Sequence, residues 1–577
     1  MANDEWILNG PTGVVSFLPE GLFDYSPCLI ELWEETERRK GCFKYYNMWG
    51  KSDKFKSIVI EIWRQPIQGC HMFQLIKKLK KLKHPLKKLN NDGYGNIDNT
   101  ALVAKTVLEN IQKQLYVDPR NVVLQAEERV AAQIYKDLDE AKNSFLAQKA
   151  KVKWVNLGDD NTRFFHSKIK ARRAQNKVLK IKDMHGVVYY EVNTIEQAFI
   201  KYYQEVLGSY TQVIKVCPTV VKKGKTATSE QAKFMLQEMT KTEVKEALFS
   251  IPVEKAHGPD GYSSGFYRDS YDIIGGDVVR VVLEFFTNGK ILHQINAIVL
   301  TLIPKLDCPS TVQDFRPIAC CNVIYKCISK IICKRLAGVL ADLISMNQSA
   351  FIKDMEIVDN ILICQDLVRL YGRKNCSPRA MLKVDLKKAY DTIEWAFIRD
   401  ILAALEFPEQ MINWIMLCVT TTSYTISLNG SHFGYFKASG LCINKAKSDM
   451  YLNGIDANMA SQIVQLVGFK MGQFPFRCLG IPISSKILGI ADCNKVVDKI
   501  VAMIGGWGFK HLSYAGRLVL VKVVLTQLHA YWARIFLLPK GVIQNMESIY
   551  RNYLWAGNAE YKHSPPVAWE TCCLPKK

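Results

Sequence analysis

The chain has 577 residues, enough for several domains of the usual ~100–200 residues each, and 48% of them are hydrophobic, so a large core can form. Its 76 Lys and Arg residues outnumber 55 Asp and Glu residues, and the formal net charge of +21 favours a polyanionic partner such as nucleic acid. A well-solvated basic surface is the alternative. No uncharged apolar run approaches the ~18–20 residues that cross a bilayer, so we expect no membrane anchor.

The cysteines are scattered. There are 17, none in a C-x-x-C pair, and the adjacent pairs at 320–321 and 572–573 do not suit a zinc site. The first ten residues, MANDEWILNG, lack the basic-then-apolar pattern of a signal peptide. We therefore expect reduced thiols and an intracellular protein, in the nucleus or the cytoplasm.

The N-terminal half is expected to be largely helical. Residues 1–30 show a strand, a Pro-Gly turn region and a second apolar strand, and residues 31–205 are mostly helical and charged. A basic amphipathic helix near 72–82 is expected to end at Pro85, and its lysines are explained slightly better as a solvated face than as a nucleic-acid surface. Its apolar positions are Met72, Phe73, Leu75, Ile76, Leu79 and Leu82. Residues 97–153 predict a helical spacer or hairpin.

A basic segment follows at 163–177, where aromatic residues interleave with cations. Phe164 and Phe165 lie beside a run of basic side chains, a composition that suits phosphate contacts combined with base stacking. The basic residues are Arg163, Lys168, Lys170, Arg172, Arg173 and Lys177.

From 241 onward the chain is expected to be mixed α/β. The polar, lysine-rich stretch 218–240 predicts a loop, whereas 297–305 and 380–386 predict strands. Residues 323–344 predict a helix whose apolar side consists of Ile324, Cys327, Ile328, Ile331 and Leu336.

One acid stands out in the stretch MLKVDLKKAYDTIEW. Asp385 lies at the end of the predicted strand among apolar residues, and a buried carboxylate there needs a cation or hydrogen-bond donors. A hard divalent metal is one natural partner, and nucleotidyl transferases hold two Mg²⁺ ions with carboxylates. A helix-capping aspartate is the alternative. The residues by themselves do not decide between the two.

The order of the motifs then resembles a known family. The stretches LIPKLDCPSTVQDFRPIACCNVIYK, NQSAFIK, VDNILICQDLVRLY and LKVDLKKAYDTIEW look like the reverse transcriptase of plant LINE-type, non-LTR retrotransposons. The likeness extends upstream through GPDGYSSGFY and GDDNTRFFHSKIKARR, and downstream through FPFRCLGIPISSK and LSYAGRLVLVKVVL. FLPEGLFDYSPCLI resembles the last strands of the apurinic-type endonuclease that precedes this polymerase.

The resemblance implies roles for several residues. Asp385 is implied as the first catalytic metal ligand in the palm, and Tyr390 as the aromatic beneath the incoming sugar. Lys305 and Arg316 match fingers cations near the template or incoming nucleotide, and Leu479 and Gly480 match the primer grip. A thumb helix is implied over 512–533, with an apolar stripe and two phosphate-facing cations: Leu518, Val521, Leu525, Leu528 and Trp532, with Arg517 and Lys522.

The family's central palm motifs are missing. In the family, a passage ending in Gln-Gly-Asp-Pro and a hairpin with an aromatic-Ala-Asp-Asp turn separate the two halves of FKASGLCINKAKS, which are joined directly here at 438–441. The GDD at 158–160 lies upstream of Asp385 and reads as a helix-capping turn, not as a substitute. Two smaller departures from the family pattern also indicate lost activity. Tyr25 replaces a histidine of the family, and Asp354-Met355 replaces Gly-Arg.

We therefore expect an α/β (α+β), right-hand polymerase-like fold with fingers, an incomplete palm and a helical thumb after a helical spacer. The expected parts are an endonuclease remnant (1–30), a basic linker region (31–205), an extension (206–300), fingers and first palm part (301–440), and palm end, primer grip and thumb (441–577). The resemblance implies Mg²⁺ at Asp385, an RNA template, a DNA primer and deoxynucleoside triphosphates. The expected function is an inactive LINE-type reverse transcriptase fragment; the alternatives are a non-catalytic RNA-binding or single-strand-binding remnant and an unfolded pseudogene product.

Overall fold

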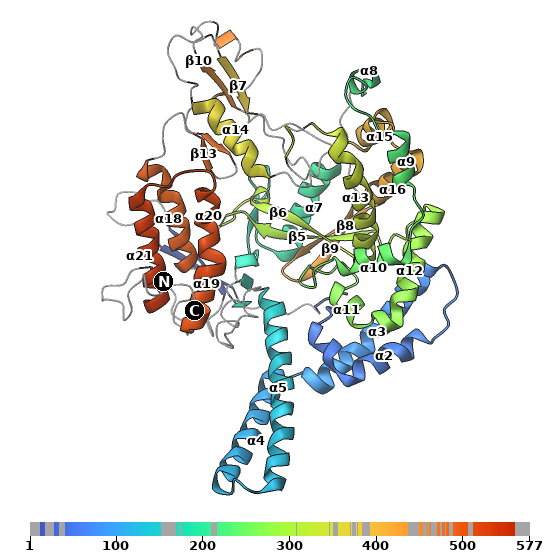
Figure 1. The fold of residues 1–577 in the computed structure, drawn as a ribbon, viewed down its shortest axis with the longest axis vertical. Helices are drawn as coiled ribbons and strands as arrows, with labels where there is room; N and C mark the ends of the chain where they lie inside the picture. Colours follow the sequence, from blue (N-terminus) through green and yellow to red (C-terminus); the bar gives the residue numbers. More distant parts are fainter. Residues whose placement is uncertain are drawn as a thin grey trace.

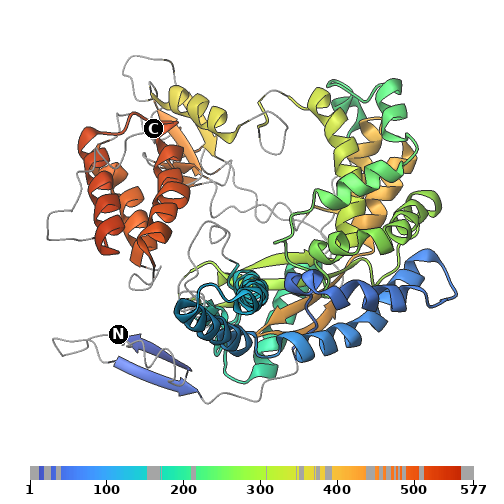
Figure 2. The same cartoon turned by 60° about the horizontal axis from the view of Figure 1, so that its bottom comes forward.

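The computed structural model describes residues 12–17, 28–33, 41–151, 169–170, 172–173, 175–208, 216–306, 308–345, 347–349, 356–369, 371, 377, 379–383, 393–436, 449–453, 459, 461–462, 465, 470–472, 476–478, 481–483, 489–505 and 512–559. A central sheet carries a large helical layer on one side, while a smaller sheet and a C-terminal helical bundle lie on the other (Figures 1 and 2). None of the described helices is long and apolar enough to cross a membrane.

The N-terminal strands form a hairpin, as the strand-turn-strand pattern predicts. Strands β1 (Thr12–Phe17) and β2 (Cys28–Trp33) pair antiparallel, from Thr12 opposite Trp33 to Phe17 opposite Cys28. Three apolar side chains of β2 are exposed: Leu29, Ile30 and Leu32.

The basic helix α3 (His71–Tyr94) continues through Pro85, so the expectation that Pro85 ends it is wrong. Leucines on both sides of the proline are buried, and this packing offsets the lost backbone hydrogen bond. Phe73 is exposed and does not belong to the buried stripe, which consists of Met72, Leu75, Leu79, Leu82, Leu86 and Leu89. Helix α3 packs against α2 (Asp53–Trp63), which follows the short helix η1 (Asn47–Lys51).

Helices α4 (Ile97–Val117) and α5 (Val122–Ala150) form the predicted helical hairpin over 97–153 and extend away from the rest of the molecule (Figure 1). Asn121 caps α5 by accepting hydrogen bonds from the backbone N–H groups of Val123 and Leu124, both at 3.1 Å. The buried residues of the hairpin are concentrated near its base: Ile97, Ala101, Ala141, Leu146 and Ala150.

The stretch 218–240, expected as a loop, contains two short helices instead. Helices α8 (Pro218–Val221) and α9 (Ser229–Met235) lie within it, and α9 begins with a reciprocal capping box between Thr228 and Gln231. Helices α10 (Lys241–Phe249), α11 (Ser264–Asp269) and α12 (Tyr271–Asn288) follow. The capping box stabilises the start of α9, whereas the loop was predicted from the lysine-rich composition alone.

The central sheet has four strands in the order β6-β5-β8-β9: β5 (Ala297–Pro304), β6 (Phe315–Cys321), β8 (Ser423–Leu428) and β9 (Ser431–Phe436). Strand β5 pairs antiparallel with β6 and parallel with β8, and β8 pairs antiparallel with β9. One sheet face packs on α7 (Val192–Gly208), where Phe199 and Tyr203 are fully buried. Beside it lie β3 (Ile181–Lys182), β4 (Val188–Tyr189) and the short helix η3 (Val312–Asp314).

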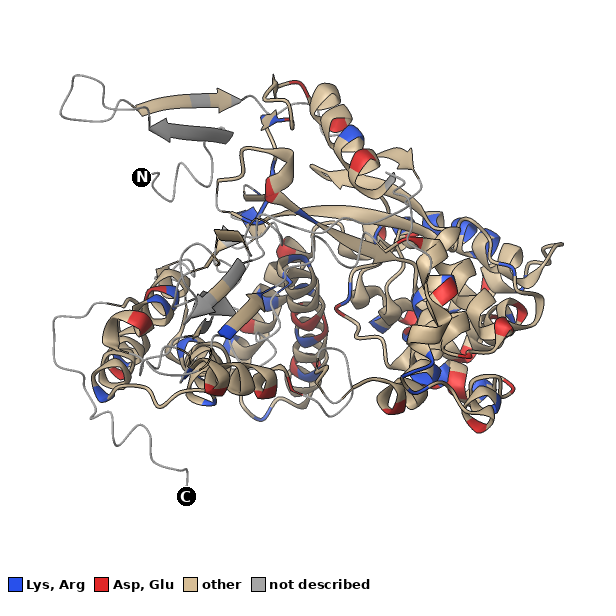
Figure 3. Cartoon of the chain, turned by 90° about the horizontal axis from the view of Figure 1, so that it is seen from above, with Lys and Arg blue, Asp and Glu red and all other residues tan. Residues whose placement is uncertain are grey.

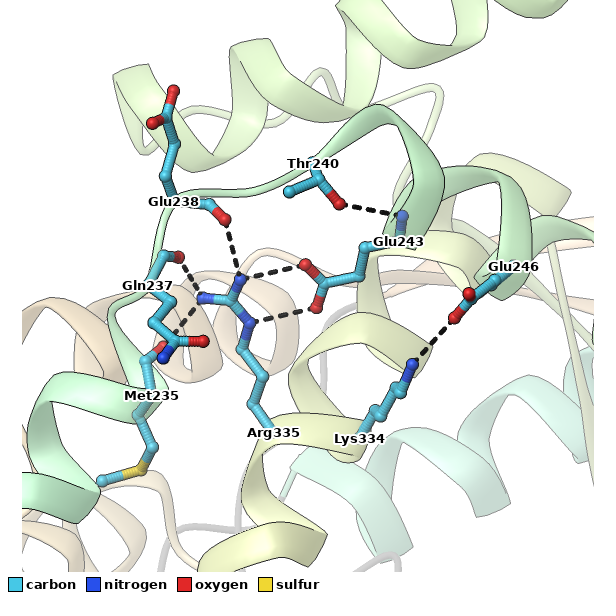
Figure 4. Close-up of polar contacts among 8 residues, drawn as sticks. All are labelled: Met235, Gln237, Glu238, Thr240, Glu243, Glu246, Lys334 and Arg335. Atoms are coloured by element: carbon cyan, nitrogen blue, oxygen red, sulfur yellow. Dashed lines mark hydrogen bonds and ion pairs between the residues drawn. The ribbon is translucent and has the colours of Figure 1, made fainter.

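Helix α13 (Val323–Leu343) runs through the main hydrophobic core and confirms the helix predicted over 323–344. Helices α15 (Trp395–Ala404) and α16 (Glu409–Thr420) join this layer. Arg335 of α13 is 5% exposed and makes a two-pronged ion pair with Glu243 at 3.1 and 3.0 Å. The same guanidinium donates to three backbone carbonyls, those of Met235, Gln237 and Glu238 (Figure 4).

A second, smaller sheet lies apart from the first in the order β11-β10-β7. Its strands are β7 (Arg379–Lys383), β10 (Asp449–Asn453) and β11 (Lys470–Met471), and the pair β12 (Phe476–Cys478) and β13 (Ile481–Ile483) follows. Helix α14 (Ile357–Arg369) lies beside them (Figure 1). The strand predicted over 380–386 is thus described as far as Lys383.

The C-terminal bundle consists of α18 (Ile490–Gly505), α19 (Tyr514–Leu520), the π-helical turn η6 (Val521–Leu525), α20 (Thr526–Ala533) and α21 (Lys540–Ala556). The consecutive elements α19, η6 and α20 cover the helix predicted over 512–533. Val521, Leu525 and Trp532 of the predicted apolar stripe are buried, and Leu528 packs against the same core.

Candidate functional site

Several residues singled out from the sequence lie outside the described residues. They comprise the implied metal ligand and sugar-facing aromatic, the primer-grip pair, part of the basic segment and the family departures: Asp385, Tyr390, Leu479, Gly480, Arg163, Lys168, Tyr25, Asp354, Met355 and the GDD at 158–160. The structure locates the strand that precedes Asp385 and the remaining basic residues.

Strand β7 precedes Asp385 in the sequence. Within the described part of the chain, this strand pairs with a neighbour along one of its two edges. It pairs antiparallel with β10, from Lys383 opposite Asp449 to Arg379 opposite Asn453. No described strand pairs with its other edge. Leu382 is 51% exposed, so this strand is not enclosed by apolar neighbours as the sequence pattern suggested.

The structure brings Lys305 and Arg316 together at one end of the central sheet. Arg316 of β6 lies opposite Ile303 of β5, and the backbone N–H of Lys305 donates to the carbonyl of Asp314 at 2.7 Å. Because side chains alternate along a strand, Ile303 and Lys305 project from the same face, the one opposite α7. Arg316 and Lys305 are exposed, and the Lys305 ammonium also donates to the carbonyl of Gln313.

The two cations predicted for the thumb have different surroundings. The Arg517 guanidinium is half-buried and donates to the carbonyl of Trp555 at 3.0 Å, so it ties α19 to α21. No described group accepts a hydrogen bond from its buried Nε. Lys522 lies in the π-helical turn and is exposed. Lys522 therefore fits a phosphate contact better than Arg517 does.

The described end of the basic segment is anchored at two points. Ile169 packs against the last two turns of α5. The backbone of Val178 exchanges two hydrogen bonds with the side chain of Asn429, both at 2.9 Å. Asn429 and Gly430 both have positive φ, as the two-residue turn between β8 and β9 requires. The remaining basic residues of this segment, Lys170, Arg172, Arg173 and Lys177, lie between the two anchors.

A tightly packed loop at 256–261, which overlaps the start of GPDGYSSGFY (258–267), was not recognised as a structural feature from the sequence. The backbone N–H of Asp260 donates to Asn322 Oδ1 at 3.2 Å, and Asp260 Oδ1 accepts from the N–H of Tyr262 at 3.0 Å. Burial raises the pKa of Asp260 to about 6 and lowers the pKa of His257 to about 4. The two glycines of GPDG are the sequence signal that could have revealed this tightly packed loop, since a Cβ at Gly261 would lie 2.1 Å from a backbone oxygen.

The charged residues are otherwise mixed over the surface. Figure 3 shows basic and acidic positions interspersed along most helices. Among the described residues no group of three or more His, Cys, Asp or Glu side chains is arranged to hold a metal ion.

Comparison with known proteins gives a consistent result. Residues 303–441 match the family described as reverse transcriptase (RNA-dependent DNA polymerase). The chain is 27% identical over 276 residues to the transposon TX1 uncharacterized 149 kDa protein of Xenopus laevis, covering 47% of this chain and 21% of that protein. It is 24% identical over 229 residues to a retrovirus-related Pol polyprotein from a type-2 retrotransposable element of Drosophila melanogaster, covering 38% and 20%.

A third relative is a putative ribonuclease H protein of Arabidopsis thaliana, 31% identical over 97 residues, which are 17% of this chain and 16% of that protein. The chain spans about a fifth of the length of these relatives, or less.

Proposed function

We propose, from the premise that the chain carries a reverse transcriptase region of the non-LTR retrotransposon type, that it binds nucleic-acid strands but does not copy them. The observation that carries this proposal is the short connection between the two sheets. Strand β9 ends at Phe436 and strand β10 begins at Asp449, which leaves the 12 residues 437–448 between them.

Twelve residues are too few for the missing hairpin. Two strands of about five residues and a two-residue turn would use all 12 and leave none to reach from the central sheet to the second sheet. No described strand pairs with the second edge of β7, where a palm hairpin would supply further strands.

The donor set also does not fit a pair of catalytic metal ions. Asp385 is present, but the sequence contains no Ala-Asp-Asp and no Gln-Gly-Asp-Pro. A two-ion site needs several carboxylates around the attacking and leaving oxygens, because each Mg²⁺ prefers six oxygen ligands. We therefore assign no catalytic step to this chain, and propose Asp385 as the surviving part of the site.

The finer assignments rest on the same resemblance. We propose a plant LINE-type origin, with residues 1–30 as an endonuclease remnant and 301–440 as fingers and first palm part. The pairing of β5 with β6 supports Lys305 and Arg316 as cations near the template or the incoming deoxynucleoside triphosphate. Tyr390 is proposed beneath the sugar, and Leu479-Gly480 as the primer grip. The C-terminal bundle supports a thumb that contacts the RNA template and DNA primer.

Primer extension tests the catalytic half of the proposal. Purified protein, a DNA primer on an RNA template, deoxynucleoside triphosphates and Mg²⁺ or Mn²⁺ are expected to give no extension, and Asp385→Ala is expected to behave like the parent. Template-dependent extension that Asp385→Ala abolishes would show that the palm is functional.

A gain-of-function variant makes the reason for inactivity testable. Inserting the family's passage with Gln-Gly-Asp-Pro and aromatic-Ala-Asp-Asp between Gly440 and Leu441 is expected to restore extension that depends on Asp385. An inserted variant that stays inactive would mean that the missing passage is not the cause. Sequencing the transcript across codons 430–450 then decides whether the cell makes the short or the complete palm.

A further inference from the structure

Segments far apart in the sequence meet at the C-terminal end of α5. Gln148 in the last turn donates to the carbonyl of Tyr45 at 2.9 Å and accepts from the N–H of Asn47 at 3.0 Å. The N–H of Tyr45 in turn donates to the carbonyl of Gly261 at 2.9 Å. Ile169 packs on the same end of α5. These contacts place residues 44–47, the end of α5, the loop 256–261 and the described start of the basic segment side by side.

Three of these segments contribute basic side chains. Lys44 precedes Tyr45, Lys149 and Lys151 lie on either side of Ala150 at the end of α5, and Arg172 lies one helical turn after Ile169. A further cation comes from α13, where the Lys326 ammonium donates to the carbonyl of Ala256 in the loop at 2.5 Å. We call these residues the α5 basic cluster: Lys44, Lys149, Lys151, Arg172 and Lys326.

The cations of the cluster influence one another. Burial lowers the pKa of Lys149, and Arg173 and Lys44 lower it further. Burial likewise lowers the pKa of Lys151, with further lowering by Arg172 and Lys44. Crowded, partly desolvated cations repel one another, and an anion relieves this repulsion.

Acidic groups balance only part of this charge. Burial lowers the pKa of both Lys149 and Lys326; Asp98 opposes this lowering at Lys149, and Cys321, Cys320 and Asp260 oppose it at Lys326. Within the described part of the chain, no ion pair involves Lys44, Lys151 or Arg172. The cluster therefore keeps an excess of positive charge.

Structural explanations account for three of the five cations. Cations near a helix C-terminus interact favourably with the helix dipole, which explains Lys149 and Lys151. Lys149 also lies over the ring of Phe145, 3.9 Å from its centroid. Lys326 donates to the carbonyl of Ala256, which ties α13 to the loop. Neither the dipole nor this hydrogen bond explains why Lys44 and Arg172 come to the same place from distant segments.

We propose that the α5 basic cluster binds the sugar–phosphate backbone of RNA, a proposal that rests on the nucleic-acid binding in the proposed function. Lysine and arginine side chains from separate segments suit a phosphate track. The rings of Phe43 and Tyr46, beside Lys44, pack against Trp49, Tyr262 and Phe145, so they hold the segment that carries Lys44 against the core.

The test compares two triple variants with the parent in binding to a fluorescent 20-nucleotide oligouridylate between 50 and 200 mM salt. The cluster variant is Lys44→Gln/Lys151→Gln/Arg172→Gln. The control, Lys54→Gln/Lys105→Gln/Lys113→Gln, removes the same charge from exposed positions on α2 and α4. Three lost contacts should flatten the plot of log affinity against log salt by about 2, and should weaken binding about a hundredfold at 0.1 M salt if binding at 1 M is unchanged. The control should keep the parent's slope.

The outcomes separate this inference from the proposed function. A parent that binds, with a cluster variant that matches the control, overturns the inference and leaves the proposed function standing. A parent that does not bind RNA overturns both. A charge-preserving variant, Lys44→Arg/Lys151→Arg, should bind like the parent; if it loses binding, positive charge is not what holds the RNA.

Discussion

Arg335→Met is expected to destabilise the helical layer strongly, because it leaves a carboxylate without its cation. The Glu243 side chain is 17% exposed and faces Arg335 through two hydrogen bonds, and three backbone carbonyls share the same guanidinium. Removing one partner of a buried ion pair costs about 3–5 kcal/mol. The adjacent pair Lys334–Glu246 is 65% and 59% exposed, and such exposed pairs contribute about 0–1 kcal/mol. Lys334→Met is therefore a matched control one residue away (Figure 4).

The free energies are best measured by native-state hydrogen exchange on the amides of α10 and α13, because a chain of this size does not unfold in one step. The double variant Arg335→Met/Glu243→Leu should recover part of the loss, since it removes the uncompensated charge but leaves the carbonyls without donors. If Arg335→Met costs no more than Lys334→Met, the ion pair does not stabilise this layer and the reasoning is refuted.

Three further predictions concern backbone and titration. Gly261→Ala should lower the thermal unfolding temperature more than Gly430→Ala, because both glycines have positive φ but only the Cβ at Gly261 meets a backbone atom; equal effects would contradict this. Pro85→Ala should raise the stability of α3 by about 1–3 kcal/mol in native-state hydrogen exchange on its amides, since proline in a helix interior costs about 3 kcal/mol, and a loss would show that the proline fits its site without strain. Neutral His257 contributes stability that is lost as pH falls from 6.5 to about 4, whereas protonated Asp260 contributes stability that is lost as pH rises from 3.8 to about 6. Urea titrations at pH 4 and 6 should therefore compare each variant with the parent. On acidification His257→Gln should gain stability relative to the parent, and Asp260→Asn should lose stability relative to the parent. Parallel profiles for the two variants would contradict both assignments.

Local sequence patterns predicted the elements whose own residues form the core. Strand β5 and helix α13 follow their predicted ranges because the apolar residues that marked those ranges, among them Leu300, Ile328 and Ile331, are buried in the core. Pro85 misled the prediction because the leucines after it are buried by α3's neighbours, and this tertiary packing is absent from the local pattern.

The candidate site was less predictable because its contacts join distant segments. Arg517 matched a phosphate-facing position by resemblance, but its guanidinium bonds a carbonyl 38 residues further on. The junction at the end of α5 depends on Gln148 bonding Tyr45 across 103 positions, and no local pattern marks either residue. By contrast, the positions of Lys305 and Arg316 follow from a short antiparallel connection, where spacing along the chain largely determines which residues meet.

The hairpin of α4 and α5 has a consequence for how the chain withstands cleavage. Its tip, around Asp118–Asn121, lies far from the base where its buried residues are concentrated, and Tyr116 beside the tip is 89% exposed. A protease that nicks this tip cuts the polypeptide without removing any contact between the two helices. The nicked protein should then separate into two fragments in a denaturing gel, yet travel as a single particle through a sizing column.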